Sequence, residues 1–243
     1  MLFYVRTLLL GPLIVAQGLR VRRTVPVLPE PPGDREGVAG NGAPLRLLIA
    51  GDSSAAGVGA NHQDEALLGM VVANLAAEFR VSWNVQATSG HKTVQTLDRL
   101  ARMTAQPFDV AVTSLGVNDA LGMVGLGQWR EHQASLRELL RRKFDVQTIV
   151  VSGLPPVHGF PALPQPLRWH IGLRASQLDR ALAADIELED DTEFIDLRFT
   201  EDASLMSSDG FHPGPAAYAE WGKRVAAGII TGLRSRTSRG KPG

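Results

Sequence analysis

Residues 45–54 read LRLLIAGDSS, and this short stretch decides the fold class. Its first six residues are mostly apolar, as expected of a strand buried on both faces of a parallel sheet, and Gly51 ends the run. Asp52, Ser53 and Ser54 follow directly. Because ligands bind beyond the carboxyl ends of the strands in an open parallel sheet, these polar residues fall where a binding site is expected.

The sequence that follows alternates between strand-like and helix-like segments. Short apolar or alternating runs predict strands, and apolar residues three or four positions apart predict helices. The predicted strands are 45–50, 81–87, 109–115, 148–152 and 194–197, and the predicted helices are 65–79, a segment from 93, 129–144, 167–186 and 215–233. We therefore expect an α/β domain with three α/β/α layers, in which helices cover both faces of a flavodoxin-like, parallel five-stranded sheet.

The composition excludes several classes of protein. The chain has 243 residues, of which 44% are hydrophobic, so it can build a full core, which excludes disorder for most of its length. Its 25 basic and 25 acidic residues give no net charge, which argues against a nucleic-acid partner because such domains usually carry a basic stripe. With no cysteine, the chain has no disulfide, thiolate nucleophile or cysteine-bound metal.

The N-terminal segment 1–23 differs from the rest of the chain. Its apolar run at 7–16 is too short to span a membrane, and Pro12 would kink a helix there. An uncleaved anchor, a helix packed on the domain and an export signal all remain open. The arginines that follow the run favour a cytoplasmic location and leave room for peripheral membrane contact, with export to the periplasm as the alternative.

Composition also predicts the domain boundaries. Residues 24–43 are crowded with proline and glycine, which predicts a linker that is extended at first and flexible thereafter. The folded domain is expected over 44–235. The last residues, 236–243, are polar and basic and are expected to form a frayed tail.

Four loops at or near the ends of the predicted strands hold the groups that acyl transfer requires. The loops are 51–54 (GDSS), 89–91 (SGH), 116–119 (GVND) and 209–213 (DGFHP). A serine such as Ser53 needs an adjacent base, which His212 could supply, and Asp209 could hold the imidazole in the correct tautomer. The amides of Ser53 and Gly90 and the side chain of Asn118 could donate N–H groups to an oxyanion.

These motifs together resemble the SGNH, or GDSL-type, hydrolases. GDS near the start, GVND downstream and DGFHP near the end follow the order and spacing of that family, whereas the G-x-S-x-G elbow of α/β-hydrolases is absent. The likeness extends from Leu45 to the last predicted helix. Ser54 departs from the pattern, because the family usually has leucine after the serine.

The resemblance implies a serine esterase or lipase that uses no metal or other cofactor. Ser53 would be the nucleophile, His212 the general base and acid, and Asp209 the residue that orients His212. Ser53, Gly90 and Asn118 would form the oxyanion hole. The substrate would be a small acyl ester. In sequence, the segment 153–167 resembles a subgroup of bacterial esterases and lipases that act on acyl or lysophospholipid substrates.

Other functions remain open at this stage. The same site could transfer an acyl group to an alcohol, an amine or a thiol, or act as a thioesterase or a sugar deacetylase, because the choice depends on how well the site excludes water. Oxygen-rich loops could instead hold a metal for phosphoester hydrolysis, with ligands from Asp52, Asn118, Asp119, Asp209 and His212. A non-catalytic binding module is the last alternative.

Overall fold

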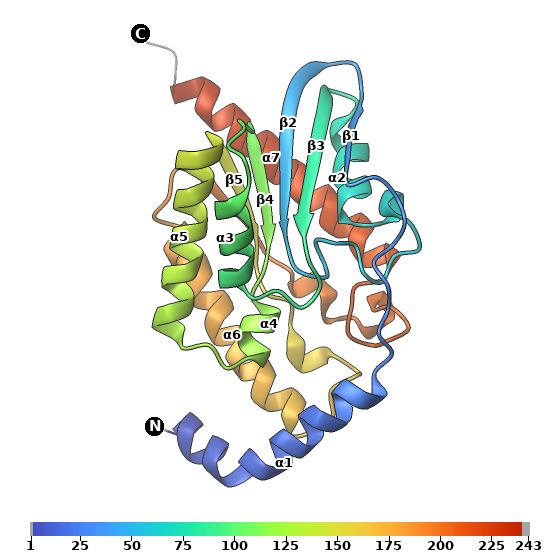
Figure 1. Ribbon diagram of the computed structural model, residues 1–243, viewed down its shortest axis with the longest axis vertical. Helices are drawn as coiled ribbons and strands as arrows, with labels where there is room; N and C mark the ends of the chain where they lie inside the picture. The colour runs from blue at the N-terminus through green and yellow to red at the C-terminus, as the bar shows by residue number, and fades with distance from the viewer. Residues whose placement is uncertain (1, 240–243) are drawn as a thin grey trace.

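A six-stranded sheet forms the centre of the computed structural model, which describes residues 2–239 (Figure 1). The strands are β1 (Glu36–Ala39), β2 (Ala43–Gly51), β3 (Phe79–Ala87), β4 (Val110–Ser114), β5 (Thr148–Ser152) and β6 (Thr192–Ile195). Their order across the sheet is β1-β3-β2-β4-β5-β6, and β2 to β6 run parallel. The α/β prediction is therefore confirmed, with one strand more than predicted.

The additional strand, β1, lies in the segment 24–43 that the composition predicted as a linker. It pairs antiparallel with the edge strand β3, from Glu36 opposite Asn84 to Ala39 opposite Val81. Gly37 is needed at its place because a Cβ there would lie 2.3 Å from the ring of Trp83. A four-residue strand with glycine inside has no apolar pattern of its own, and its pairing with β3 depends on contacts far along the chain.

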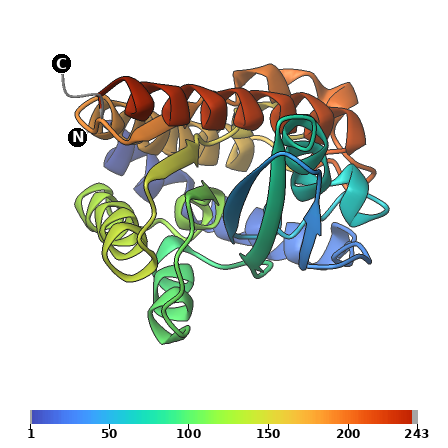
Figure 2. The ribbon, with the colours of Figure 1, turned by 90° about the horizontal axis from the view of Figure 1, so that it is seen from above.

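Helices cover both faces of the sheet. They are α1 (Leu2–Thr24), α2 (Leu67–Leu75), α3 (Thr93–Arg102), α4 (Val117–Leu121), α5 (Leu126–Phe144), α6 (Leu167–Ile186) and α7 (Pro215–Arg239). Figure 2 shows α7 on one side of the sheet and α3 and α5 on the other. Helix α7 includes 236–239 of the predicted tail, and 240–243 lie outside the described residues.

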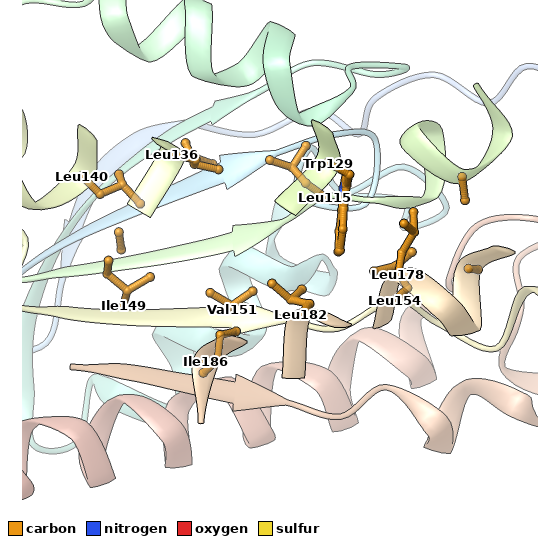
Figure 3. Packing of buried hydrophobic residues seen from close by; sticks show 14 of the residues in the cluster. Leu115, Trp129, Leu136, Leu140, Ile149, Val151, Leu154, Leu178, Leu182 and Ile186 are labelled. Carbon is orange, nitrogen blue, oxygen red and sulfur yellow. The ribbon is translucent and has the colours of Figure 1, made fainter. Parts of the chain in front are cut away.

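Each face of the sheet has its own hydrophobic core. On one face, side chains of α5, β5 and α6 meet, among them Leu136, Val151 and Leu182 (Figure 3). On the other face, α2 and α7 pack against alternate residues of the same strands. Every residue of β4 (VAVTS) and β5 (TIVVS) is buried, which explains why these strands are mostly apolar and could be predicted.

Helix α1 lies across the carboxyl end of the sheet, next to α6, and Figure 1 shows that it changes direction within its length. Pro12 lies inside this helix. Gln17 holds α1 to the start of α6, since its Nε2 donates to the carbonyl of Gln165 (2.6 Å) and its Oε1 accepts from the N–H of Leu167 (3.0 Å). No helix in the described range 2–239 is long and apolar enough to cross a membrane.

Candidate active site

A serine, a histidine and an aspartate form a connected chain at the carboxyl edge of the sheet. Ser53 lies just after β2, and His212 lies 159 residues later in the loop before α7. The His212 Nε2 and Ser53 Oγ atoms are 3.0 Å apart, and His212 Nδ1 lies 2.6 Å from Asp209 Oδ2. Ser53, and not the neighbouring Ser54, makes the contact to the imidazole. This geometry can pass the serine proton to a histidine that a carboxylate orients.

Asp209 is held as an anion by the turn that contains it. Its Oδ1 accepts hydrogen bonds from the N–H groups of Phe211 and His212, both at 2.9 Å, and from the Ser207 hydroxyl at 2.8 Å. Its side chain is 0% exposed, and burial alone would raise the pKa of the carboxyl. The hydrogen bonds from His212, Phe211 and Ser207 outweigh burial and hold the pKa of Asp209 well below its usual range.

The turn itself explains why Asp209 and His212 face each other. The N–H of Gly210 donates to the Ser207 carbonyl, and the N–H of Ser207 donates to the His212 carbonyl. Gly210 has a φ of +64°, a conformation that favours glycine. The spacing of three residues therefore comes from a closed turn, which places the carboxylate against the imidazole.

Two backbone N–H groups at the site are available to a ligand. Within residues 2–239, the N–H of Ser53 and the N–H of Gly90 donate to no other group of the chain. Gly90 has a φ of +80° in the turn after β3, which explains glycine at this position. Both residues line the same groove as His212. Two free N–H donors beside a serine are suited to hold an oxyanion.

Asn118, the third predicted donor, lies near the start of α4, after Gly116, whose φ is +133°. Its Nδ2 donates to Asp52 Oδ2 at 3.2 Å and to the carbonyl of His91 at 3.1 Å. Both of its amide protons are therefore engaged within the protein. An oxyanion beside Ser53 would share or replace one of these two hydrogen bonds.

Two further carboxylates, which the sequence also offered as metal ligands, support the loops around the site. Asp52 is 4% exposed and accepts from the N–H of Ser54 at 3.0 Å in addition to Asn118. Burial raises the pKa of Asp52 to about 7. Asp119 accepts from the N–H and the hydroxyl of Thr93, and so ties α4 to the start of α3.

Two hollows of very different size adjoin the serine and histidine. A small cavity of about 40 Å³ lies on one side, with Leu154, Phe160 and Trp221 among its apolar residues. It is large enough for little more than water. On the other side an open groove of about 750 Å³ runs between the site and α1, and its lining is mostly apolar. The sequence did not indicate that α1 would line the site, although the α1 residues that line the groove recur at helical spacing.

The geometry does not support the alternative of metal-dependent phosphoester hydrolysis. Asp209 is engaged with His212 and its own turn, and Asp119 with Thr93. Across the described part of the chain, no group of three or more histidine or acidic side chains could hold a metal ion.

The three-layer fold and the groups at its carboxyl edge define a carboxylic ester hydrolase of the α/β class, distinct from the α/β-hydrolases with a G-x-S-x-G elbow. The profile of the GDSL-like lipase/acylhydrolase family matches residues 49–220. The chain belongs to this family.

Individual relatives agree with this assignment. A GDSL-like esterase of Mycobacterium tuberculosis is 28% identical over 230 residues, which cover 85% of this chain and 72% of that protein. Among solved structures, a lipase from a goat rumen metagenome has a TM-score of 0.60 at 20% identity, covering 76% of this chain and 97% of that one. An inhibitor-bound aryl esterase of M. smegmatis has a TM-score of 0.59 at 18% identity, covering 77% and 99%. At this identity the structures show that the fold is shared.

Proposed function

We propose that the protein hydrolyses carboxylic esters through an acyl-enzyme formed on Ser53. The observation that carries this proposal is the unbroken chain of hydrogen bonds from Ser53 through His212 to Asp209. A serine hydroxyl is a weak nucleophile unless a base takes its proton, and His212 Nε2 is within reach to do so. Ionised Asp209 fixes the tautomer and balances the charge that forms on the imidazole.

The reaction then proceeds in two halves. Ser53 Oγ attacks the ester carbonyl carbon while its proton moves to His212, and the carbonyl oxygen takes the negative charge. The N–H groups of Ser53 and Gly90, with the amide of Asn118, stabilise this oxyanion. His212 returns the proton to the departing alcohol. Water, deprotonated by His212, then attacks the acyl-enzyme and releases the carboxylic acid and free Ser53.

The substrate we propose is an acyl ester with an apolar part, such as a lysophospholipid-like ester. Support comes from the groove beside Ser53 and His212, where Leu163, Leu167 and Ile171 contribute apolar surface. Transfer of the acyl group to another alcohol, and thioester hydrolysis, use the same residues. Adding an acceptor alcohol to an ester assay and following both products separates hydrolysis from transfer.

The experiment that tests this function is ester hydrolysis with EDTA present throughout. We expect the protein to release p-nitrophenol from p-nitrophenyl esters and to be labelled by a fluorophosphonate, which reacts with an activated serine. A protein that is labelled by no fluorophosphonate and hydrolyses no ester would not be a serine esterase. Activity that EDTA abolishes and added metal restores would favour the metal-dependent alternative.

Replacing Asn118 with alanine is expected to lower kcat by roughly a hundredfold, because one donor to the oxyanion is lost while the nucleophile and base remain. The measurement is kcat and KM on p-nitrophenyl butyrate. The matched control is Asn74→Ala on the exposed face of α2, where the side chain donates only to the Met70 carbonyl. Equal activity of the two variants would remove Asn118 from the oxyanion hole.

The buried carboxyl of Asp52 is expected to make stability depend on pH. Between about pH 4 and pH 7 the folded chain keeps a proton on Asp52 that the unfolded chain has released, so this group lowers the free energy of unfolding as the pH rises. The Asp52→Asn variant lacks this titration. Its free energy of unfolding relative to the wild type should therefore rise over that range, by on the order of a few kcal/mol, and level off above it. Urea unfolding at pH 5 and pH 8 measures the difference, and an unchanged difference would contradict the prediction.

We also propose that the protein works in the cytoplasm and touches a membrane surface through α1. Val15 and Leu19 are 61% and 51% exposed on this helix, and arginines at 20, 22 and 23 follow. Exposed apolar and basic groups on one helix suit an anionic bilayer surface. Co-sedimentation with phosphatidylglycerol vesicles, but not with phosphatidylcholine vesicles, is the expected result.

A further inference from the structure

The N-terminal helix α1 carries a stripe of residues that faces the site. Residues 11, 14, 18, 21 and 25 recur at intervals of three and four positions, and all five line the groove beside Ser53. Residues at this spacing lie on one face of a helix. The opposite wall comes from α4, the segment after it and α6, where Leu121, Met123 and Ile171 contribute apolar side chains.

Two positions of this stripe are glycines, Gly11 and Gly18. A Cβ built on either residue would meet no atom within 4 Å. Seven positions apart, they lie on the same face of the helix, where the missing side chains leave open space. Glycine inside a helix costs stability relative to alanine, by roughly 0.5–1 kcal/mol. Neither glycine is required by close packing, so what they provide is the width of the groove.

The other hollow at the site cannot take a long substituent. Its volume is about 40 Å³ against about 750 Å³ for the groove. Of these two hollows, only the groove along α1 therefore has room for an aliphatic chain attached to an ester carbonyl at Ser53. Its burial against the apolar walls would contribute about fourfold in affinity for each methylene group.

We infer that α1 is the specificity-determining wall of the active site and that the groove it closes holds an aliphatic chain of the ester substrate. This inference rests on the proposed ester hydrolysis. Gln17 anchors the wall through its two hydrogen bonds to Gln165 and Leu167, beside the groove. Gly18 sets the space available to the chain.

The test is a series of substitutions at Gly18, to alanine, leucine and tryptophan. The control is Leu13→Trp, which adds a similar bulk to α1 at an exposed residue that does not line the groove. One set of substrates varies the acyl chain, from p-nitrophenyl acetate to dodecanoate. A second set varies the alcohol, from ethyl to decyl acetate. The readout is kcat/KM for each substrate.

We expect kcat/KM of the wild type to rise with chain length in one of the two sets, and that set identifies whether the acyl or the alcohol chain occupies the groove. Gly18→Trp should lower kcat/KM by tenfold or more for chains of eight carbons and longer, through KM. It should change kcat/KM for the acetates of short alcohols by less than twofold. For long chains, kcat/KM of Gly18→Leu should lie between the values for Gly18→Ala and Gly18→Trp. The value for Leu13→Trp should match that of the wild type.

Three results would overturn the inference while ester hydrolysis stands. They are no gain with chain length in either set, an equal loss on short and long substrates, and equal behaviour of Gly18→Trp and Leu13→Trp. Binding of cis-parinaric acid, a fluorescent fatty acid, to the Ser53→Ala variant tests the groove without turnover. Binding that Gly18→Trp weakens would support the groove even if no ester were hydrolysed, and in that case only the proposed function would fail.

Discussion

Replacing Ser53 with alanine is expected to lower kcat for ester hydrolysis by roughly a thousandfold or more and to abolish fluorophosphonate labelling. The reason is that the Ser53 hydroxyl is the group that His212 Nε2 contacts, at 3.0 Å. Removing that hydroxyl leaves the oxyanion donors and the groove in place, so KM should change little. Hydrolysis of p-nitrophenyl esters, measured with EDTA present, gives both parameters.

The neighbouring serine supplies a matched control. Ser54 adjoins Ser53, and its N–H and carbonyl are bonded to Asp52 and Tyr218 through the backbone, which substitution preserves. Ser54→Ala should therefore keep most of the activity and the labelling. If Ser54→Ala lost activity and Ser53→Ala did not, the nucleophile would be Ser54.

The second large effect is expected for Asp209→Asn, with a loss in kcat of roughly a thousandfold to ten-thousandfold. The carboxylate Oδ2 accepts a hydrogen bond from His212 Nδ1. An amide at this position can present N–H instead, which favours the tautomer with the proton on Nε2, facing Ser53. Histidine in that form cannot take the proton from the serine.

The Asp209→Asn variant should still fold, since an amide oxygen can accept from the backbone N–H groups of Phe211 and His212 as the carboxylate does. Asp202→Asn is the control: it removes the same charge from an exposed aspartate that caps a short turn at Ser204. We expect this control to keep wild-type kcat. Comparable losses in the two variants would mean that charge alone, and not the contact to His212, explains the effect.

The parts of the fold that could be predicted are those whose burial leaves a local pattern in the sequence. β5 occupies the predicted residues 148–152, a mostly apolar run buried throughout, and α6 occupies the predicted residues 167–186, where buried residues recur at helical spacing. β1 could not be predicted, since its pairing depends on the register of β3. The five-residue helix α4 begins at Val117 and is too short to have a period, so the sequence predicts a loop over 116–119 instead.

The candidate site divides in the same way. The motifs predicted which residues gather at the carboxyl edge, and the structure brings Ser53, His212 and Asp209 into contact. The hydrogen bonds of Asn118 could not be predicted, because they join it to residues 66 and 27 positions away in the chain. The position of α1 depends on Gln17 meeting residues about 150 positions further on, which no local pattern encodes.

The short strand β1 has a consequence for association between copies of the protein. An uncovered edge strand offers unpaired backbone groups to other molecules and promotes aggregation. β1 covers β3 on that side, and Glu36 of β1 accepts a hydrogen bond from the side chain of Asn84, which lies opposite it on β3. A protein shortened to begin at residue 44, where composition places the domain boundary, would lose this cover and leave residues 81–84 of β3 open to a strand from a second molecule. The segment that looks like a linker therefore protects an edge of the sheet.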